Sequence, residues 1–472
     1  NITKWKARHV HSAADVPKHM RPTCNQHAKR MAEREKNMRN MKKALAAVAA
    51  VATLASLAAC GGSDGGNDAK ANAGDADKAV LVFLGWDTGN TMKALIADFE
   101  KANPGITVKF NNTGTASDTQ TALSNAVAAG KGAPDVVMLE DPTVTQFAVT
   151  GDLVDLTAYG ADKLEDDFSA GPWSKLQYDG KPYALPIDSG PEVFFYNDAV
   201  LKKAGVDGSQ IKTWDDYYEA AKKVKAIGAY MTNNSGSSME YQPFTAQAWQ
   251  AGAQPWKVDG ENITIDMTKD SGMKKYIEFQ QKLIDEDLVD TKIANWSDDW
   301  NRALNEGDIA TLTIGAWMPV NLMNGAPDQA GNWRVAQLPQ WNEGDEVSAE
   351  DGGSALAVVS QSKQQAAAYK FVEYLTHGDG AQTMAGTFPS LKKILSSDSF
   401  TDPNTEANKK VNDYFGGQNV NEILSEAAQR KVSAFQYLPY NPYAQSTFGD
   451  QISKAYSEDI TLEEAFVNYS KA

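Results

Sequence analysis

The rare reactive side chains of this 472-residue chain are gathered at its amino terminus, and this limits the chemistry of the remainder. Four of the five histidines and one of the two cysteines precede residue 41, and the other two residues are Cys60 and His377. A His/Cys zinc site, a Cys–His nucleophile pair and an internal disulfide are therefore excluded from the main body. We expect no metal, no cofactor and no enzymatic activity, and we assign no catalytic residue.

Tryptophans and carboxylates are instead the abundant functional groups. Ten of the eleven tryptophans lie beyond Cys60, and from that residue onward 58 acidic and 33 basic residues give a net charge of −25. Indoles stack on the apolar faces of sugar rings, while carboxylates and amides bind sugar hydroxyls, so this composition favours a carbohydrate ligand. The negative charge disfavours nucleic acid and leaves a cationic small solute as an alternative ligand.

Common catalytic motifs fail when they are examined residue by residue. Gly130-Lys131 resembles a phosphate-binding loop, but Gly132 stands where Ser or Thr is required. Ser189 has Pro191 where a nucleophile elbow needs glycine. The acids are numerous enough to supply a glycosidase pair, but the sequence does not place two of them together. A lipoprotein glycoside hydrolase therefore stays open as an alternative function.

A lipoprotein export signal is predicted from Met41, where the chain reads MKKALAAVAAVATLASLAAC. Two lysines precede an apolar run that is shorter than the ~20 residues of a transmembrane helix, and the run ends in a segment that resembles the lipobox. The resemblance implies that 41–59 is removed and that Cys60 carries acyl chains such as palmitate. The protein would then be held on the outer face of the cytoplasmic membrane. Residues 60–77 are rich in Gly, Asp and Ala, and we expect a flexible tether there.

Residues 1–40 precede this signal, are basic and begin with Asn1. We interpret them as a non-native upstream extension. The alternative is a basic cytoplasmic arm on a retained anchor, which would leave Cys60 unprocessed.

The first part of the body alternates strands with helices. Apolar patterns predict strands at 80–84, 106–110 and 135–139, with helices at 92–101 and 121–129. This order is typical of an α/β fold with parallel neighbouring strands, which bind ligands at the carboxyl ends of the strands. Further along the chain, the patterns predict helices at 214–227, 272–285 and 364–375 and strands at 311–314, 333–339 and 354–360.

Five segments of the body occur in the order of a known family. They are GKGAPDVVMLEDPTVTQFAVTGDLVDLT, DGKPYALPIDSGPEVFFYNDAVLKKAGV, TWDDYYEAAKKV, GDIATLTIGAW and GGSALAVVS. In this order the chain resembles bacterial extracellular solute-binding proteins of the sugar-binding, maltose-binding-like family 1, the lipoprotein receptors of ABC importers. The resemblance covers essentially the whole body.

The family implies a two-lobed periplasmic-binding-protein-like fold with three crossover segments and a ligand cleft between the lobes. The first lobe would hold 78–188 plus 319–352, and the second 192–315 plus 356–472. The resemblance further implies a monomer that closes around a carbohydrate, expected to be an oligosaccharide, and delivers it to the permease of an ABC transporter.

Candidate ligand-binding residues follow from strand ends, from the crossovers and from the family. Trp317 directly follows the second expected crossover strand, where the family commonly places a stacking aromatic residue. The other candidates at strand ends or near crossovers are Trp86, Asp87, Asp141, Asp188, Ser189, Asp351, Gly353 and Ser354, and those of the second lobe are Trp249 and Tyr440.

Overall fold

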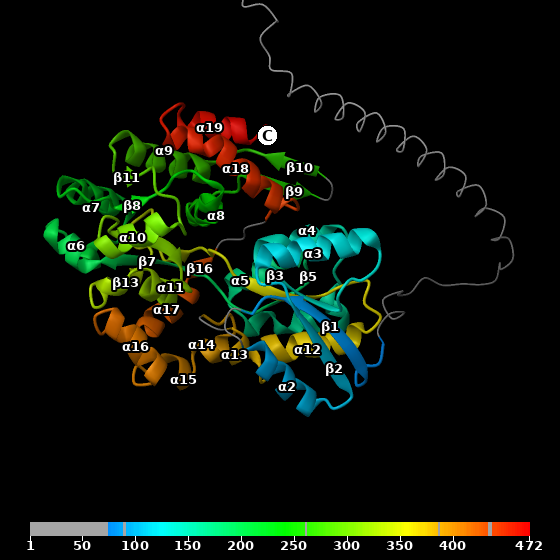
Figure 1. The fold of residues 1–472 in the computed structure, drawn as a ribbon. Helices are drawn as coiled ribbons and strands as arrows, with labels where there is room; N and C mark the ends of the chain where they lie inside the picture. The colour runs from blue at the N-terminus through cyan, green and yellow to red at the C-terminus, as the bar shows by residue number, and fades with distance from the viewer. Residues whose placement is uncertain (1–73, 88–90, 260–261, 386–387, 433–436) are drawn as a thin grey trace, which may run out of the picture. The chain divides into compact units, whose positions relative to one another are not determined.

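The computed structural model describes residues 74–87, 91–259, 262–385, 388–432 and 437–472 (Figure 1). The predicted signal, Cys60 and nearly all of the predicted tether lie outside the described residues. The described part falls within one compact unit, residues 68–472. No helix of the described ranges is long and apolar enough to cross a membrane.

A five-stranded sheet forms the centre of the first lobe, in the order β2-β1-β3-β15-β6. Its parallel part consists of β1 (Ala79–Gly85), β2 (Ile106–Asn112) and β3 (Val136–Glu140), as the alternating pattern predicts. Two strands are antiparallel to their neighbours, β15 (Ser354–Val358) and β6 (Leu185–Pro186). The carboxyl ends of β1 and β3 therefore lie at one edge of the sheet.

Helices cover both faces of this sheet (Figure 1). Phe83 of β1 packs in one core with α2 (Met92–Ala102) and α12 (Gln365–Thr376). The next residue, Leu84, packs in a second core with side chains of α3 (Ala116–Ala129) and α4 (Asp141–Val149). Successive strand side chains point to opposite faces, so an unbroken apolar strand needs a layer on each side.

The second lobe is built on a three-stranded antiparallel sheet in the order β12-β7-β13. Its central strand is β7 (Glu192–Asn197), between β12 (Thr311–Gly315) and β13 (Trp333–Gln337). Here too, successive residues reach different cores, because Phe194 faces the larger helical layer and Phe195 faces α16 (Glu406–Tyr414) and α17 (Val420–Ala428).

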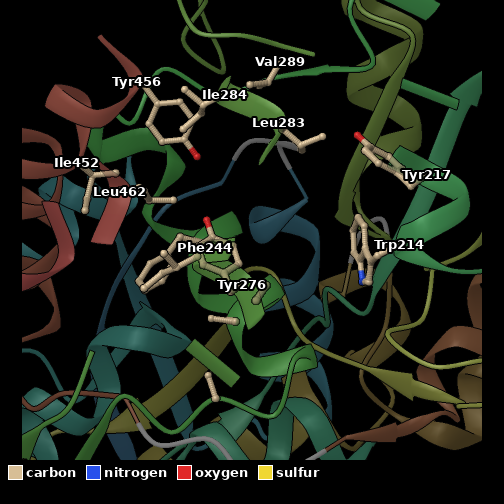
Figure 2. Close-up of a cluster of buried hydrophobic side chains, with 14 of the residues drawn as sticks. Trp214, Tyr217, Phe244, Tyr276, Leu283, Ile284, Val289, Ile452, Tyr456 and Leu462 are labelled. Carbon is tan, nitrogen blue, oxygen red and sulfur yellow. The ribbon is translucent and has the colours of Figure 1, made fainter. Parts of the chain in front are cut away.

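Aromatic side chains fill the larger helical layer (Figure 2). The buried face of α7 (Trp214–Ala226) carries Trp214 and Tyr217, and Thr213 and Asp216 form the capping box that starts this helix at the expected position. The other labelled side chains come from the neighbouring helices α8 (Tyr241–Gln250), α9 (Ser271–Asp285), α18 (Asn441–Tyr456) and α19 (Leu462–Tyr469), except Val289, which lies in the short strand β11 (Val289–Asp290).

Short elements complete the chain. The 3₁₀ helices are η3 (Leu156–Tyr159), η4 (Ala161–Asp167), η5 (Gly208–Gln210), η6 (Ser238–Glu240) and η7 (Pro327–Gln329). The short α-helices are α5 (Ala170–Lys175), α6 (Asp198–Lys203), α10 (Asp298–Glu306), α11 (Met318–Gly325), α13 (Ala381–Met384), α14 (Lys392–Leu395) and α15 (Asp398–Thr401). The short strands are β4 (Gln177–Tyr178), β5 (Lys181–Pro182), β8 (Thr232–Asn233), β9 (Trp256–Asp259), β10 (Asn262–Ile265), β11 (Val289–Asp290), β14 (Val347–Ser348) and β16 (Lys431–Val432).

The expected lobe boundaries are wrong at two places. Residues 356–472 were assigned wholly to the second lobe, but β15 is hydrogen-bonded to β3 and α12 packs on the first sheet. Residues 319–352 were assigned to the first lobe, but β13 pairs with β7. The strand in GDIATLTIGAW is thus followed by more of the second lobe rather than by a crossover, because backbone pairing, which the apolar pattern does not specify, decides the sheet.

The chain passes between the sheets at two crossover segments that meet in space, 188–191 and 350–353. Gly190 and Asp351 join them, since the Asp351 N–H donates to the Gly190 carbonyl at 2.7 Å. The chain changes lobe again near 388–395, where Leu391 packs in the first-lobe core and Leu395 packs with the second.

Candidate ligand-binding cleft

A cavity of about 400 Å³ lies between side chains of the two lobes. Its lining includes Trp86 and Glu140 at the ends of β1 and β3, and Gln242 and Trp317 of the second lobe, with a crossover segment between them. Pockets of 300–1,000 Å³ that combine apolar surface with a few polar groups are typical sites for small ligands. Its position matches the expectation that ligands bind at the carboxyl ends of the strands.

Two indoles and a methionine form what we call the aromatic wall: Trp296, Trp317 and Met239. The rings of Trp296 and Trp317 lie 5.6 Å apart between centroids, at 31° to each other. Trp317 is fixed from behind, because its indole N–H donates to the Asp351 carbonyl at 2.6 Å. This bond leaves the indole faces to contact other groups.

Trp296 is held in an unusual backbone conformation, with φ at +67°. Its side chain is 41% exposed, and its ring also contacts Trp300, 5.0 Å away between centroids. A bulky residue at positive φ costs of order 1–3 kcal/mol, and such strain concentrates at ligand sites. Here the strained turn presents an indole to the cavity instead of burying it.

Another part of the lining, which we call the crossover wall, consists of Asp188 and residues 351–354. The Asp188 carboxylate accepts two hydrogen bonds from Ser354, from the backbone N–H at 2.6 Å and from Oγ–H at 2.8 Å. Burial raises the pKa of Asp188 to about 7, against the opposing effect of the Ser354 hydrogen bonds.

Asp351 presents an unpaired oxygen within the same wall. Its backbone is tied to Gly190 and Trp317, and its carboxylate accepts from the Gly315 N–H, but its buried Oδ2 has no hydrogen-bond partner. Burial raises the pKa of Asp351 to about 7. A buried acceptor without a partner is costly to the fold.

Gly353 makes the turn of the crossover wall possible. Its φ is +114°, and a Cβ at this position would meet the Asp141 carboxylate. Only glycine meets both requirements. Glu140, which the sequence did not single out, adds a third carboxyl to the cavity, and burial followed by the charge of Asp141 raises its pKa.

Comparisons with known proteins identify the family. The sequence profile described as bacterial extracellular solute-binding protein matches residues 85–382. The chain belongs to this family.

A solved structure resembles this solute-binding protein over nearly the whole body. It is the ABC transporter-associated binding protein from B. animalis subsp. lactis Bl-04, solved in complex with β-1,6-galactobiose. The two sequences are 44% identical, the match covers 83% of this chain and 96% of the other, and the TM-score is 0.70. The galacto-N-biose/lacto-N-biose I-binding protein from Bifidobacterium longum, solved with lacto-N-biose, is 26% identical over 84% of this chain and 96% of its own, also with a TM-score of 0.70.

Among curated proteins, the arabinooligosaccharide-binding protein of Bacillus subtilis (strain 168) is 28% identical over 66% of this chain and 72% of its own length. These relatives are named as binding proteins of sugars. They agree with the family resemblance read from the sequence, and the two-lobed α/β fold is confirmed.

Six of the eleven ligand-binding candidates of this solute-binding protein lie on one cavity. They are Trp86, Asp188, Trp317, Asp351, Gly353 and Ser354. Their contact with a ligand stays a prediction, but the structure brings them together from four separate stretches of the chain.

Three polar candidates have structural roles instead of lining the cavity. Asp87 starts α2, because its carboxylate accepts from the Thr91 and Met92 N–H groups at 3.0 and 3.1 Å. Asp141 is fully buried, with Oδ2 2.9 Å from the Lys175 Nζ. Ser189 is buried and donates to Glu350. Each follows a strand or lies in a crossover as expected, but none is among the residues that line the cavity.

Two aromatic candidates also lie elsewhere. Trp249 is buried in the second-lobe core, on the inner face of α8. Tyr440 lines a separate cavity of about 320 Å³ beside Tyr443 and Tyr469. Helical periodicity would have placed Trp249 in the core, because Thr245 and Ala248 on the same helix are buried with it.

The sequence reasoning missed Met239, Gln242 and Trp296, and it placed Glu140 at an expected ligand-binding strand end without choosing it as a site residue. Glu140 was detectable as the last residue of a buried strand. Met239 comes from η6, Gln242 from the first turn of α8 and Trp296 from a turn, and their approach to the cleft depends on the second-lobe packing. No group of three potential metal ligands occurs among the described residues.

Proposed function

We propose that this solute-binding protein captures a short galactoside, of the size of a disaccharide, and delivers it to an ABC importer. The observation that carries this proposal is that Trp317 and Asp351 meet on one cavity, joined by a hydrogen bond between them. The relative that is 44% identical, solved with β-1,6-galactobiose, supports the choice of sugar.

The cavity combines the two kinds of contact that a sugar ring needs. The indoles of Trp86, Trp296 and Trp317 offer flat apolar surface for C–H faces. The carboxyl groups of Asp188 and Asp351 and the amide of Gln242 offer acceptors and donors for hydroxyls. A site built for hydroxyls rejects analogues that lack them, because its buried polar groups would stay unpaired.

Ligand capture is coupled to lobe closure, since the two lobes share the ligand. Trp86 belongs to the first lobe and Trp317 to the second, so a sugar that contacts both indoles favours the closed arrangement by its differential affinity. The crossover segments are the elements about which the lobes turn, and the closed protein is the form that the permease recognises.

A cationic solute is the second candidate, because the titratable side chains that line the cavity are all acidic: Glu140, Asp188 and Asp351. The three indoles of the same cavity favour a sugar over such a solute, because they offer flat apolar surface for C–H faces.

A ligand panel separates the candidates. We expect β-1,6-galactobiose to raise the melting temperature and to bind in calorimetry, with lactose and an arabino-oligosaccharide weaker and spermidine silent. At a concentration of 100 times its dissociation constant, a ligand stabilises by about 2.7 kcal/mol. A shift with spermidine alone would overturn the carbohydrate proposal, and sugar released during the incubation would point to a glycoside hydrolase.

The membrane anchor is part of the same proposal. The lipobox supports acylation of Cys60, which lies outside the described residues. Cys60→Ser should leave the protein soluble after cell disruption, whereas the wild type should enter the detergent phase. Detergent partitioning of Cys60→Ser would rule out this lipid anchor.

A further inference from the structure

A fully buried ammonium group lies directly behind the crossover wall. Lys175 ends α5 with no exposed side-chain surface, and its Nζ lies 2.9 Å from Asp141 Oδ2 and 3.9 Å from Glu350 Oε2. Taking an ammonium out of water costs several kcal/mol, and replacing such a pair by apolar residues is often neutral or stabilising. Stability alone therefore gives weak reason for this lysine.

The third contact of Lys175 leads to the ligand cavity. Its Nζ donates to the carbonyl of Gly352 at 2.5 Å, and the next carbonyl, that of Gly353, accepts from the Asp141 N–H at 3.0 Å. The Lys175–Asp141 pair thus holds two consecutive carbonyls of the crossover wall from behind. Both glycines have positive φ and no side chain to pack, whereas the residues on either side, Asp351 and Ser354, are tied to Gly190, Trp317 and Asp188.

The orientation of the two ligand-facing groups depends on the same turn. Asp351 immediately precedes Gly352, and its carbonyl receives the Trp317 indole N–H. A rotation of the peptide after Asp351 would move that carbonyl and release the indole. Lys175 does not line this cavity; it is among the residues that line a second cavity of about 590 Å³.

We infer that Lys175 is a positioning residue for ligand binding, whose ammonium holds the Gly352 carbonyl and thereby fixes Asp351 and Trp317 for the sugar. This inference rests on the proposed function, because it assumes that the ligand binds between the crossover wall and the aromatic wall. Lys175 positions the turn through its hydrogen bond to the Gly352 carbonyl. The carboxylates of Asp141 and Glu350 keep the lysine charged.

The test must separate that hydrogen bond from simple charge balance. Lys175→Met alone leaves Asp141 buried without its cation and is expected to unfold readily. Lys175→Met combined with Asp141→Asn removes the two charges of the 2.9 Å pair and keeps the Asp141 backbone N–H. The third buried charge, Glu350, loses its cation but still accepts from Ser189 and from the Gly190 N–H. Asp141→Asn alone is the matched control, since it retains the lysine and its bond to Gly352.

We expect the double variant to melt near the wild type but to bind β-1,6-galactobiose at least tenfold more weakly, and the control to bind within about threefold of the wild type. Affinity within twofold of the wild type in the double variant would show that Lys175 only balances charge. An equal loss in Asp141→Asn would also overturn the inference. If the double variant does not fold, Lys175→Met with Asp141→Leu is measured in its place.

A second measurement does not depend on the ligand. Hydrogen exchange of the Trp317 indole N–H in the unliganded protein should be slow in the wild type and the control and fast in the double variant. Slow exchange in all three would contradict the positioning role even if no sugar binds. Absence of sugar binding by the wild type would count against the proposed function alone.

Discussion

The two walls of the cleft are built by different means. Asp351 and Ser354 of the crossover wall are 2% and 7% exposed, and their polar atoms are tied to Gly190, Trp317 and Asp188 by short hydrogen bonds. In the aromatic wall, Trp296 and Met239 are 41% and 46% exposed. One wall is fixed by directional bonds, and the other consists largely of half-exposed apolar surface.

This difference indicates how affinity and adaptability are divided in the site. A wall whose side chains are already held loses little entropy on binding, so its contacts are available in full to the ligand. An exposed indole loses water on binding and gains contact area with many sugar shapes. We therefore expect the crossover wall to select hydroxyl positions and the aromatic wall to provide most of the affinity.

The largest effect is expected at Trp317, which belongs to the aromatic wall but is fixed by the crossover wall. Trp317→Ala removes a central aromatic anchor, which typically costs about 2 kcal/mol or more on truncation. At about 1.4 kcal/mol per decade, affinity should fall roughly thirtyfold or more in calorimetry.

Trp214→Ala is the control for this substitution. Trp214 is buried in the second-lobe core and donates its indole N–H to Gln250. Its loss should lower the melting temperature while the remaining folded protein still binds. Near-wild-type affinity in a folded Trp317→Ala protein would remove Trp317 from the site and break the comparison of the two walls.

A smaller loss is expected for Trp296→Ala, because this indole stands at the exposed part of the aromatic wall. About tenfold weaker binding, or about 1.4 kcal/mol, is the expected result in calorimetry. The variant should keep the melting temperature of the wild type, because the half-exposed Trp296 side chain contributes little to the core. Alanine can adopt the same positive φ. A loss as large as that of Trp317→Ala would show that the two indoles act as one unit.

The crossover wall should make binding depend on pH. The pKa of Asp351 is raised from its ordinary 3.8 to about 7, so the carboxyl ionises as pH rises through neutrality. Hydrogen bonds from sugar hydroxyls to the ionised form are stronger by about 1 kcal/mol, which predicts roughly fivefold tighter binding at pH 8 than at pH 5.5. Calorimetric titration of the sugar at both pH values checks this prediction. In Asp351→Asn, sugar affinity should depend less on pH, with only the contribution of Asp188 remaining.

The same shift has the opposite effect on the unliganded fold. Between about pH 4 and pH 7, Asp351 stays protonated in the native state but ionises in the unfolded state, so the native state binds more protons. Its contribution to the free energy of unfolding is complete below pH 4 and is lost as pH rises through 7. Denaturant titrations without ligand should show this trend weakened in Asp351→Asn.

The smallest effect is expected for Tyr440→Ala, which lies outside both walls. Because Tyr440 lines a different cavity with Tyr443, sugar affinity should stay within twofold of the wild type. A tenfold loss of sugar affinity in calorimetry would mean that the binding site extends to the start of α18, beyond the two walls described above.

The sequence by itself determined the kind of fold and the place of the site within it. Strand and helix positions in the first lobe follow from local apolar periods, which burial on both faces of a sheet requires. The family segments and the rarity of His and Cys directed attention to binding rather than catalysis. Trp317 and the glycines near 352 were found because their position after a strand and their backbone freedom are local properties.

Only the tertiary structure decided which side chains line the cavity and which lobe each later strand joins. Asp141 and Asp188 are both carboxylates beside strand ends, yet one pairs with Lys175 and the other lines the cavity. Trp249 and Trp296 are both second-lobe indoles, but helix α8 turns one into the core and a strained turn exposes the other. The physical reason is that burial and partner choice depend on residues distant in sequence, such as the pairing of β15 with β3 and of β13 with β7, whereas periodicity specifies only the local element.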